Sequence, residues 1–188
     1  MQLASDYFAM QNGNMSGKSE EKQLSLSSAK DHIDTSAFEQ IQEMDDNDDR
    51  EFSKTIVSEF FAQAEKTFTQ MQALMYCFRT WGYTLHRKPL TVVWAYRKKE
   101  DLPELSSLGH YLKGSSATLG LIKIKQACED IQNLGMGLDE NGEKPKKPLD
   151  KQATLALIQS KLQTMKIDLN HVKFCLRVFY KYNFEPKV

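Results

Sequence analysis

The chain contains Leu105-Ser-Ser-Leu-Gly-His-Tyr-Leu-Lys-Gly-Ser-Ser-Ala-Thr-Leu-Gly120, a stretch that sorts into two faces when it is wound as a helix. At about 100° per residue, its leucines fall within about 40° of the pole opposite His110. An apolar face of this kind predicts a helix that packs on a core, and it leaves His110 on the opposite side. The leucines of this face are Leu105, Leu108, Leu112 and Leu119.

The side of the helix that carries His110 combines one cation with residues that have almost no side chain. Lys113, Gly114 and Ala117 follow His110 at three, four and seven residues. A glycine inside a helix costs about 1 kcal/mol relative to alanine, so Gly114 indicates a need for close approach. Histidine can accept a phosphoryl group without an activating base, and a nearby lysine offsets the charge. The alternative is an ordinary surface or core histidine.

Two segments carry a resemblance to a known family: His110-Tyr-Leu-Lys-Gly-Ser-Ser-Ala-Thr-Leu-Gly120 and Cys128-Glu-Asp-Ile-Gln-Asn-Leu-Gly135. In order and spacing they resemble the histidine-containing phosphotransfer domain, and in particular the fungal phosphorelay intermediates. The resemblance runs from about residue 36 to about residue 182 and is interrupted once, between about residues 75 and 98.

The resemblance implies a fold, an activity and a set of site residues. It implies a four-helix bundle in which His110 takes a phosphoryl group from the receiver-domain aspartate of a hybrid sensor kinase and passes it to the aspartate of a response regulator. Lys113 would offset the phosphoryl charge, Gly114 would give access, and Gln132 would hydrogen-bond the imidazole and orient it. An ordinary solvent-facing glutamine remains the alternative for Gln132. Catalytic residues and magnesium would belong to the receiver, so we expect no cofactor, metal, ATP site or autokinase activity in this chain.

Composition excludes several classes of protein. The chain has 188 residues and 25 basic and 25 acidic side chains, so its formal net charge of +0 gives no footprint for nucleic acid or for a membrane surface. It contains no run of about 18 apolar residues and no signal-peptide pattern. We therefore expect a soluble protein of the cytoplasm and nucleus. Cys77, Cys128 and Cys175 lie far apart and are expected to be reduced thiols.

Residues 1–34 are rich in polar residues and show no sustained period, which predicts a disordered N-terminal tail. The bundle domain is expected at residues 35–184. Thr35 or Ser36 followed by Glu39 forms a capping-box pattern, and Phe38, Ile41 and Met44 recur at helical spacing. We expect a short helix here that covers the bundle, because it is too short to be stable alone.

The acidic run Asp45-Asp-Asn-Asp-Asp49 resembles the beginning of a calcium loop. The pattern fails in detail, because the sixth position is Arg50 instead of glycine and the twelfth is Ile56 instead of glutamate. We interpret the run as a solvated turn that places negative charge at the N-terminus of the next helix, with Asp49 or a neighbour as its cap.

Residues 51 to about 75 form a predicted long helix with more apolar residues than a bundle seam needs. Its inward stripe consists of Phe60, Ala64, Phe68, Met71 and Met75. Part of the excess is expected under the short helix, and the rest is expected to be exposed and available to partners. The candidate docking residues are Phe38, Ile41, Met44, Phe52 and Ile56.

Two further helices complete the expected bundle. One runs from 122 to about 136, and the last carries a heptad seam at Leu155, Ile158, Leu162, Met165, Leu169, Val172, Leu176 and Phe179. Alone, the seam would suggest a coiled-coil dimer, but the other amphipathic helices also need a partner for their apolar faces. The sequence therefore predicts an all-α, monomeric, antiparallel up-down-up-down four-helix bundle with a short capping N-terminal helix. His171 and Lys173 are interpreted as structural, and His32 and His86 receive no role.

The segment 76–97 is an atypical insertion, because it holds both tryptophans, Trp81 and Trp94, and no acidic residue. One explanation is a functional loop. The other, which we favour, is a translated intron, since codons for Met75-Tyr76, Leu90-Thr91 and Tyr96-Arg97 can supply splice signals in frame. Its removal would leave a short polar turn before residue 102.

Two other functional classes remain for His110. A phosphohistidine hydrolase would need a second set of acid, base or metal ligands, which the sequence does not show. A helical-bundle interaction protein without phosphoryl chemistry would have no reason to place Gly114 beside His110.

Overall fold

The computed structural model describes residues 29–79, 101–147 and 149–184. This part of the chain is helical, and its single extended pairing is an isolated bridge between Ile33 and Leu121. The insertion, apart from residues 76–79 at the end of one helix, and residues 1–28 of the predicted tail lie outside the described residues. The helices are α3 (Thr35–Gln42), α4 (Glu51–Arg79), α6 (Leu102–Thr118), α7 (Ile122–Gly135) and α8 (Lys151–Tyr180).

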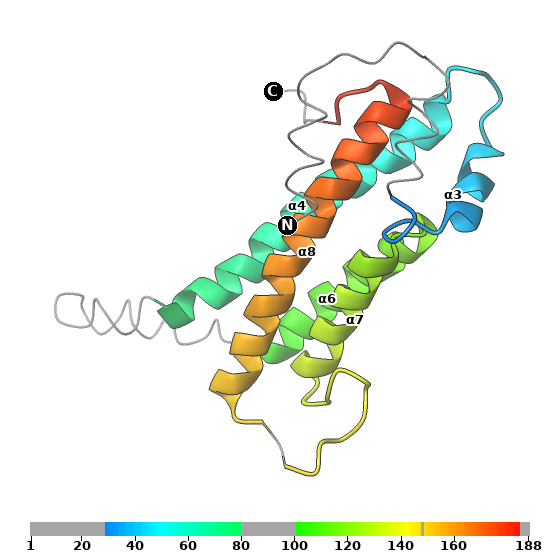
Figure 1. The fold of residues 1–188 in the computed structure, drawn as a ribbon. Coiled ribbons are helices and arrows are strands. Elements are labelled where there is room, and N and C mark those ends of the chain that lie inside the picture. The colour runs from blue at the N-terminus through cyan, green and yellow to red at the C-terminus, as the bar shows by residue number, and fades with distance from the viewer. Residues whose placement is uncertain (1–28, 80–100, 148, 185–188) are drawn as a thin grey trace, which may run out of the picture.

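Four of these helices form the predicted bundle. Each of α4, α6, α7 and α8 packs against two others, so the contacts α4–α6, α6–α7, α7–α8 and α8–α4 close a ring. Successive helices of this ring run in opposite directions, and α3 lies at the end of the bundle where α6 passes into α7 (Figure 1). The predicted all-α, antiparallel bundle with a capping helix is confirmed.

The core consists of the stripes that helical periodicity predicts. The inward stripe of α4 is buried from Phe60 to Met75, and the heptad seam of α8 is buried from Leu155 to Phe179. On α7, the apolar positions from Ile124 to Leu134 are buried as well. Burying one such side chain contributes about 1.5–3 kcal/mol, so the bundle depends on these stripes meeting one another.

Aspartates cap three of the helices. Asp101 accepts a hydrogen bond from the Glu104 N–H at 3.2 Å at the start of α6, and Asp150 accepts one from the Ala153 N–H at 2.7 Å at the start of α8. The cap of α3 is Asp34, which accepts from the Ser36 N–H at 3.0 Å. The predicted cap at Thr35 or Ser36 is therefore wrong by one or two residues, because Asp34 supplies a carboxylate directly before the helix.

Helix α3 closes one end of the core. Phe38 is fully buried and packs edge to face against Phe179 and Tyr180, with ring centroids 6.0 and 6.2 Å apart. Ile41, one turn later, is also buried. The short helix is thus stabilised by tertiary packing, as its length requires.

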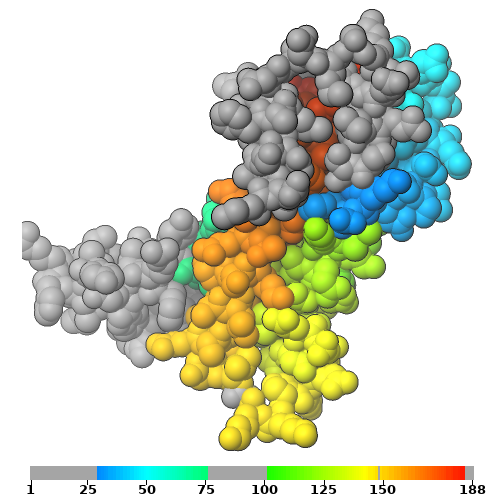
Figure 2. Space-filling model, in the orientation of Figure 1, coloured from blue at the N-terminus to red at the C-terminus, as the bar shows by residue number. Residues whose placement is uncertain are grey.

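Residues 29–34, which the sequence placed in the disordered tail, are packed against the bundle, so that boundary was wrong. They lie between α8 and the turn that joins α6 to α7 (Figure 2). The Ile122 N–H donates to the His32 carbonyl at 2.9 Å, and the Asp34 N–H donates to the Gly120 carbonyl at 2.8 Å. Gly120 has a φ of 68°, and a Cβ there would lie 2.7 Å from the Asp34 carbonyl oxygen, so this turn requires glycine.

The acidic run before α4 acts as a turn, as predicted. Asp45 accepts a hydrogen bond from the Ser53 N–H at 2.9 Å in the first turn of α4, so the run does supply a carboxylate to this helix, from Asp45 at its beginning. Among the described residues, no group of three or more acidic, histidine or cysteine side chains could hold a metal ion.

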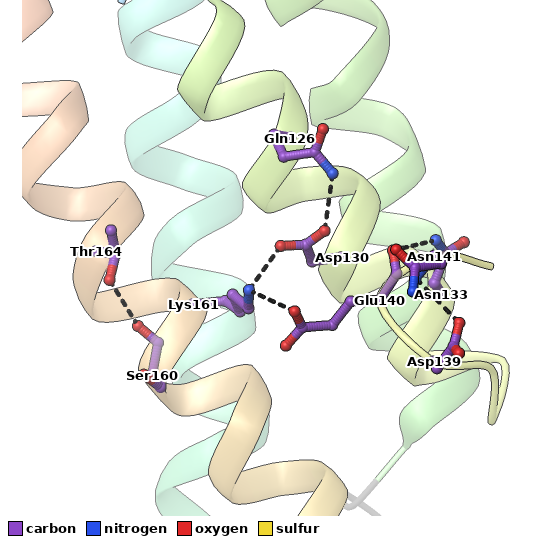
Figure 3. Close-up of polar contacts among 9 residues, drawn as sticks. All are labelled: Gln126, Asp130, Asn133, Asp139, Glu140, Asn141, Ser160, Lys161 and Thr164. Atoms are coloured by element: carbon purple, nitrogen blue, oxygen red, sulfur yellow. Dashed lines mark hydrogen bonds and ion pairs between the residues drawn. The ribbon is translucent and has the colours of Figure 1, made fainter. Parts of the chain in front are cut away.

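An ion-pair network joins α7, the following loop and α8. Lys161 on α8 lies 2.8 Å from Asp130 Oδ2 on α7 and 3.2 Å from Glu140 Oε2 in the loop (Figure 3). Gln126 also donates to Asp130, at 3.0 Å. Asp130 is nearly buried, so these partners are needed to offset the cost of removing its charge from water.

Within the described residues, no helix combines the length and the apolarity that crossing a membrane requires.

Candidate functional site

His110 lies on the solvent side of α6, as its spacing from the leucines predicts. The imidazole-bearing residue is exposed, whereas Leu105, Leu112 and Leu119 on the opposite face are buried. Leu108 is half-buried and packs against the same core. The apolar face therefore anchors α6 on the core, and the opposite face presents the one histidine of this helix to solvent.

The surface beside His110 is open. Gly114 and Ala117 are both exposed, and a Cβ built on Gly114 would meet no heavy atom within 4 Å. The packing of the bundle therefore does not require a glycine at position 114. Because a glycine inside a helix costs about 1 kcal/mol relative to alanine, its presence needs another reason. The open surface agrees with the predicted access role of Gly114.

Helix α7 lies very close to α6 at the residue directly before His110. A Cβ on Gly109 would lie 2.9 Å from the Cys128 carbonyl oxygen and 3.0 Å from the Gln132 backbone nitrogen. Real side chains essentially never make contacts this short, so Gly109 is required for the two helices to approach. This contact places the backbone of Gln132 beside the helix turn that carries His110.

The Gln132 backbone is fixed, whereas its side chain is not paired. The Ser106 hydroxyl on α6 donates to the Gln132 carbonyl at 2.9 Å. In the described part of the chain the Gln132 Oε1 is buried without a hydrogen-bond partner, and no hydrogen bond joins Gln132 to His110. The orienting role of Gln132 therefore stays a prediction, and its amide oxygen is free to accept a hydrogen bond from an imidazole N–H.

Lys113 points across the helix contact toward α7. Its Nζ lies 3.4 Å from Oε1 of Glu129, and its side chain is only 24% exposed. Burial raises the pKa of the neighbouring Cys128 thiol to about 12, while the Lys113 charge acts in the opposite direction. Cys128 is thus an inert core thiol, and Lys113 brings a positive charge to the α6–α7 contact one turn from His110.

The candidate docking residues divide into exposed and buried members. Met44 is 61% exposed and Phe52 is 42% exposed, whereas Ile56 is half-buried against the core. Phe38 and Ile41 are buried, so their assignment to a docking surface was wrong. Both side chains attach α3 to the bundle, which leaves Met44 and Phe52 as the exposed members of the candidate docking set.

Sequence reasoning missed four residues of the site: Ser106, Gly109, Tyr111 and Glu129. Gly109 had a signal, because it too is a glycine inside a helical pattern, and Tyr111 is a large exposed side chain beside His110, with 60% of its surface exposed. The pairing of Ser106 with Gln132 and of Glu129 with Lys113 joins residues 26 and 16 positions apart, so no local pattern marked them.

Several known proteins are similar to this chain in sequence, in fold or in both. Multistep phosphorelay regulator 1 of Schizosaccharomyces pombe is 45% identical over 103 residues, which are 55% of this chain and 28% of that protein. Phosphorelay intermediate protein YPD1 of Saccharomyces cerevisiae is 38% identical over 107 residues, 57% of this chain and 51% of that protein. The matched segment thus spans about half or less of the length of these relatives.

Among solved structures, the yeast phosphorelay protein YPD1 superposes with a TM-score of 0.60 at 28% identity, covering 80% of this chain and 96% of that chain. A co-crystal structure of the S. cerevisiae histidine phosphotransfer signaling protein Ypd1 with the receiver domain of its downstream response regulator Ssk1 gives a TM-score of 0.59 at 30% identity, covering 80% and 95%. Residues 55–167, more than half of the chain, match the family described as the Hpt domain, and the chain therefore belongs to the Hpt domain family.

Proposed function

We propose that this chain is a phosphorelay intermediate that carries a phosphoryl group on His110 between two receiver domains. The observation that carries the proposal is an exposed histidine on a rigid helix, with open space above Gly114 and the Lys113 cation one turn away. The open surface at Gly114 would let a receiver domain bring its phosphorylated aspartate close to the imidazole.

In the proposed phosphoryl transfer, His110 is the only residue of this chain whose covalent bonds change. The lone pair of a ring nitrogen attacks phosphorus, the bond between phosphorus and the receiver aspartate breaks, and the aspartate leaves as a carboxylate. The proton on the other ring nitrogen stays on the phosphorylated imidazole. The second transfer reverses these bond changes with a different receiver.

One of the two proposed partners is supported by a relative. The S. cerevisiae relative forms a complex with the receiver domain of a response regulator, and we assign the same class of downstream partner to this chain. As the upstream partner we propose the receiver domain of a hybrid histidine kinase. The receivers would supply the catalytic groups, and this chain would act as the carrier.

The test uses the receiver domain of Ssk1, carrying a labelled phosphoryl group on its aspartate, mixed with this chain. We expect label on this chain that is labile in acid and stable in alkali, which distinguishes phosphohistidine from phosphoserine. His110→Gln should fold normally, because the residue is exposed, and should take no label. Label retained by the variant, or none on the wild type, would refute the proposal.

The same proposal includes a monomer that works in the cytoplasm and the nucleus. Support for the monomer comes from α8, whose heptad seam from Leu155 to Phe179 is buried inside the bundle and is not available for a coiled-coil dimer. Light scattering during size-exclusion chromatography tests the monomer, and imaging of a fluorescent fusion tests the location.

A further inference from the structure

The cation next to His110 already has an anionic partner. Lys113 Nζ lies 3.4 Å from Glu129 Oε1, and the Lys113 side chain is packed along the α6–α7 contact instead of extending into solvent. Glu129 itself is 41% exposed. In the free protein, therefore, the charge that should meet a phosphoryl group is shared with a carboxylate of this same chain.

Lys113 has one possible partner on each of the two helices, namely a phosphoryl group on His110 of α6 and the carboxylate of Glu129 on α7. His110 is three residues before Lys113 on α6, and Glu129 is three residues before Gln132 on α7, so each pair is separated by one helical turn. The short contact at Gly109 fixes how α7 lies against α6. The flexible Lys113 stem lets its ammonium pair with either Glu129 or a group on His110.

We propose that Glu129 is a positioning residue that holds Lys113 on the α7 side and thereby lowers the stability of phosphorylated His110 relative to the free protein. The inference rests on the phosphoryl-carrier function proposed above. A phosphoryl group carries a charge of about −1.5 to −2 and competes for Lys113 with the single charge of Glu129. Phosphorylation then moves Lys113 to His110 and releases Glu129 to the solvent that already reaches it.

The consequence is a carrier that gives up its phosphoryl group readily. An intermediate that bound the group too firmly would accept it and not pass it on, since only the difference between the two states sets the transfer equilibrium. Removing Glu129 should therefore raise the equilibrium ratio of phosphohistidine to receiver phosphoaspartate. The rise should be roughly two- to fivefold, the range expected for one partly exposed ion pair.

The experiment measures this ratio with the same Ssk1 receiver domain, approached from both directions so that equilibrium is demonstrated. Glu129→Gln keeps the size of the side chain and removes its charge. It is compared with the wild type, with Lys113→Met, and with the Lys113→Met/Glu129→Gln double variant. Glu65→Gln is the matched control, because Glu65 is also a partly exposed glutamate that pairs with a lysine of another helix, Lys173 at 2.8 Å. Circular dichroism and thermal unfolding establish that each variant is folded.

We expect Glu129→Gln to raise the ratio in the wild-type background, to leave it unchanged in the Lys113→Met background, and to have less effect as ionic strength increases. An unchanged or lower ratio in Glu129→Gln would overturn the inference. So would an equal rise in the Lys113→Met background, which would mean direct repulsion, or an equal rise in Glu65→Gln, which would mean a general charge effect. If the wild type itself takes no label, the proposed function fails instead.

Discussion

At the scale of single residues, two glycines of α6 serve opposite purposes. Gly109 is enclosed by the backbone of α7, whereas Gly114 faces open space. The same substitution at the two positions should therefore have opposite effects on stability, which separates packing from access.

For Gly114 we predict that access, not helix stability, limits which side chains function. Gly114→Ala should raise the free energy of unfolding by up to about 1 kcal/mol through helix propensity and should keep most of the transfer rate. Gly114→Gln should gain similar stability but slow transfer strongly, because its long side chain covers the surface beside His110. Chemical denaturation and single-turnover transfer give the two quantities, and unchanged transfer in Gly114→Gln would show that the open surface is not used.

For Gly109 we predict that the substitution by alanine lowers stability. The methyl group that an alanine adds at this position would lie 2.9 Å from the Cys128 carbonyl oxygen, and neither helix backbone can move easily. Gly109→Ala should therefore lower the free energy of unfolding by about 1–3 kcal/mol, as for overpacked cores. Denaturant unfolding beside Gly114→Ala provides the comparison. Equal stability of the two variants would contradict the close approach of α6 and α7.

At the scale of elements, the segment 29–34 brings a buried histidine into the bundle. His32 is 7% exposed, and its Nε2 lies 3.2 Å from Asp168 Oδ1 on α8 and 3.2 Å from Lys123 Nζ on α7. The His171 ring on α8 is 4.5 Å away. Burial, followed by Lys123 and His171, lowers the pKa of His32 below its usual 6.5, against the opposing effect of Asp168.

This shift predicts a pH-dependent stability. In the unfolded chain His32 takes up a proton as the pH falls through about 6.5, while in the folded protein it resists protonation until a lower pH. The contribution of His32 to the free energy of unfolding should therefore be constant well above pH 6.5. It should fall as the pH drops below 6.5, because the unfolded chain then binds a proton that the folded protein does not.

Urea unfolding on both sides of pH 6.5 checks this prediction. His32→Gln should lose part of the slope with pH. The matched control is His110→Gln, which removes an exposed imidazole and should retain the slope. Identical slopes in the wild type and in His32→Gln would show that His32 is not responsible.

At the scale of the whole molecule, the burial of Phe38 and Ile41 leaves Met44 and Phe52 as the exposed members of the candidate docking set. We predict that Met44→Ala and Phe52→Ala together weaken receiver binding at least tenfold, which is the loss of one or two interface anchors. Ile167→Ala is the matched control, because Ile167 is 68% exposed on α8 and should not affect binding.

Calorimetric titration with the Ssk1 receiver measures this effect. An apolar interface should depend little on salt, so binding that disappears between low and moderate ionic strength would favour recognition by charge. A loss in Ile167→Ala equal to that in the double variant would place the docking surface elsewhere.

The sequence by itself determined the helices, their inward stripes and the outward direction of His110. These features are periodic along the chain, so that Leu105, Leu112 and Leu119 define a face without reference to any other segment. The limits predicted for α4 and α7 were accordingly close to those observed, and the predicted seam of the last helix lies within α8. The resemblance to a known family added Gln132, which periodicity alone could not have selected.

Only the tertiary structure decided how the helices meet. It showed that Phe38 is buried in the core, that His32 packs against the bundle, and that Glu129 pairs with Lys113. Each of these contacts joins two segments that are far apart in the chain. The periodicity of one segment carries no information about which distant side chain it will contact. The periodic pattern could place His110 at the surface, but the surroundings of that histidine are set by contacts between α6 and α7.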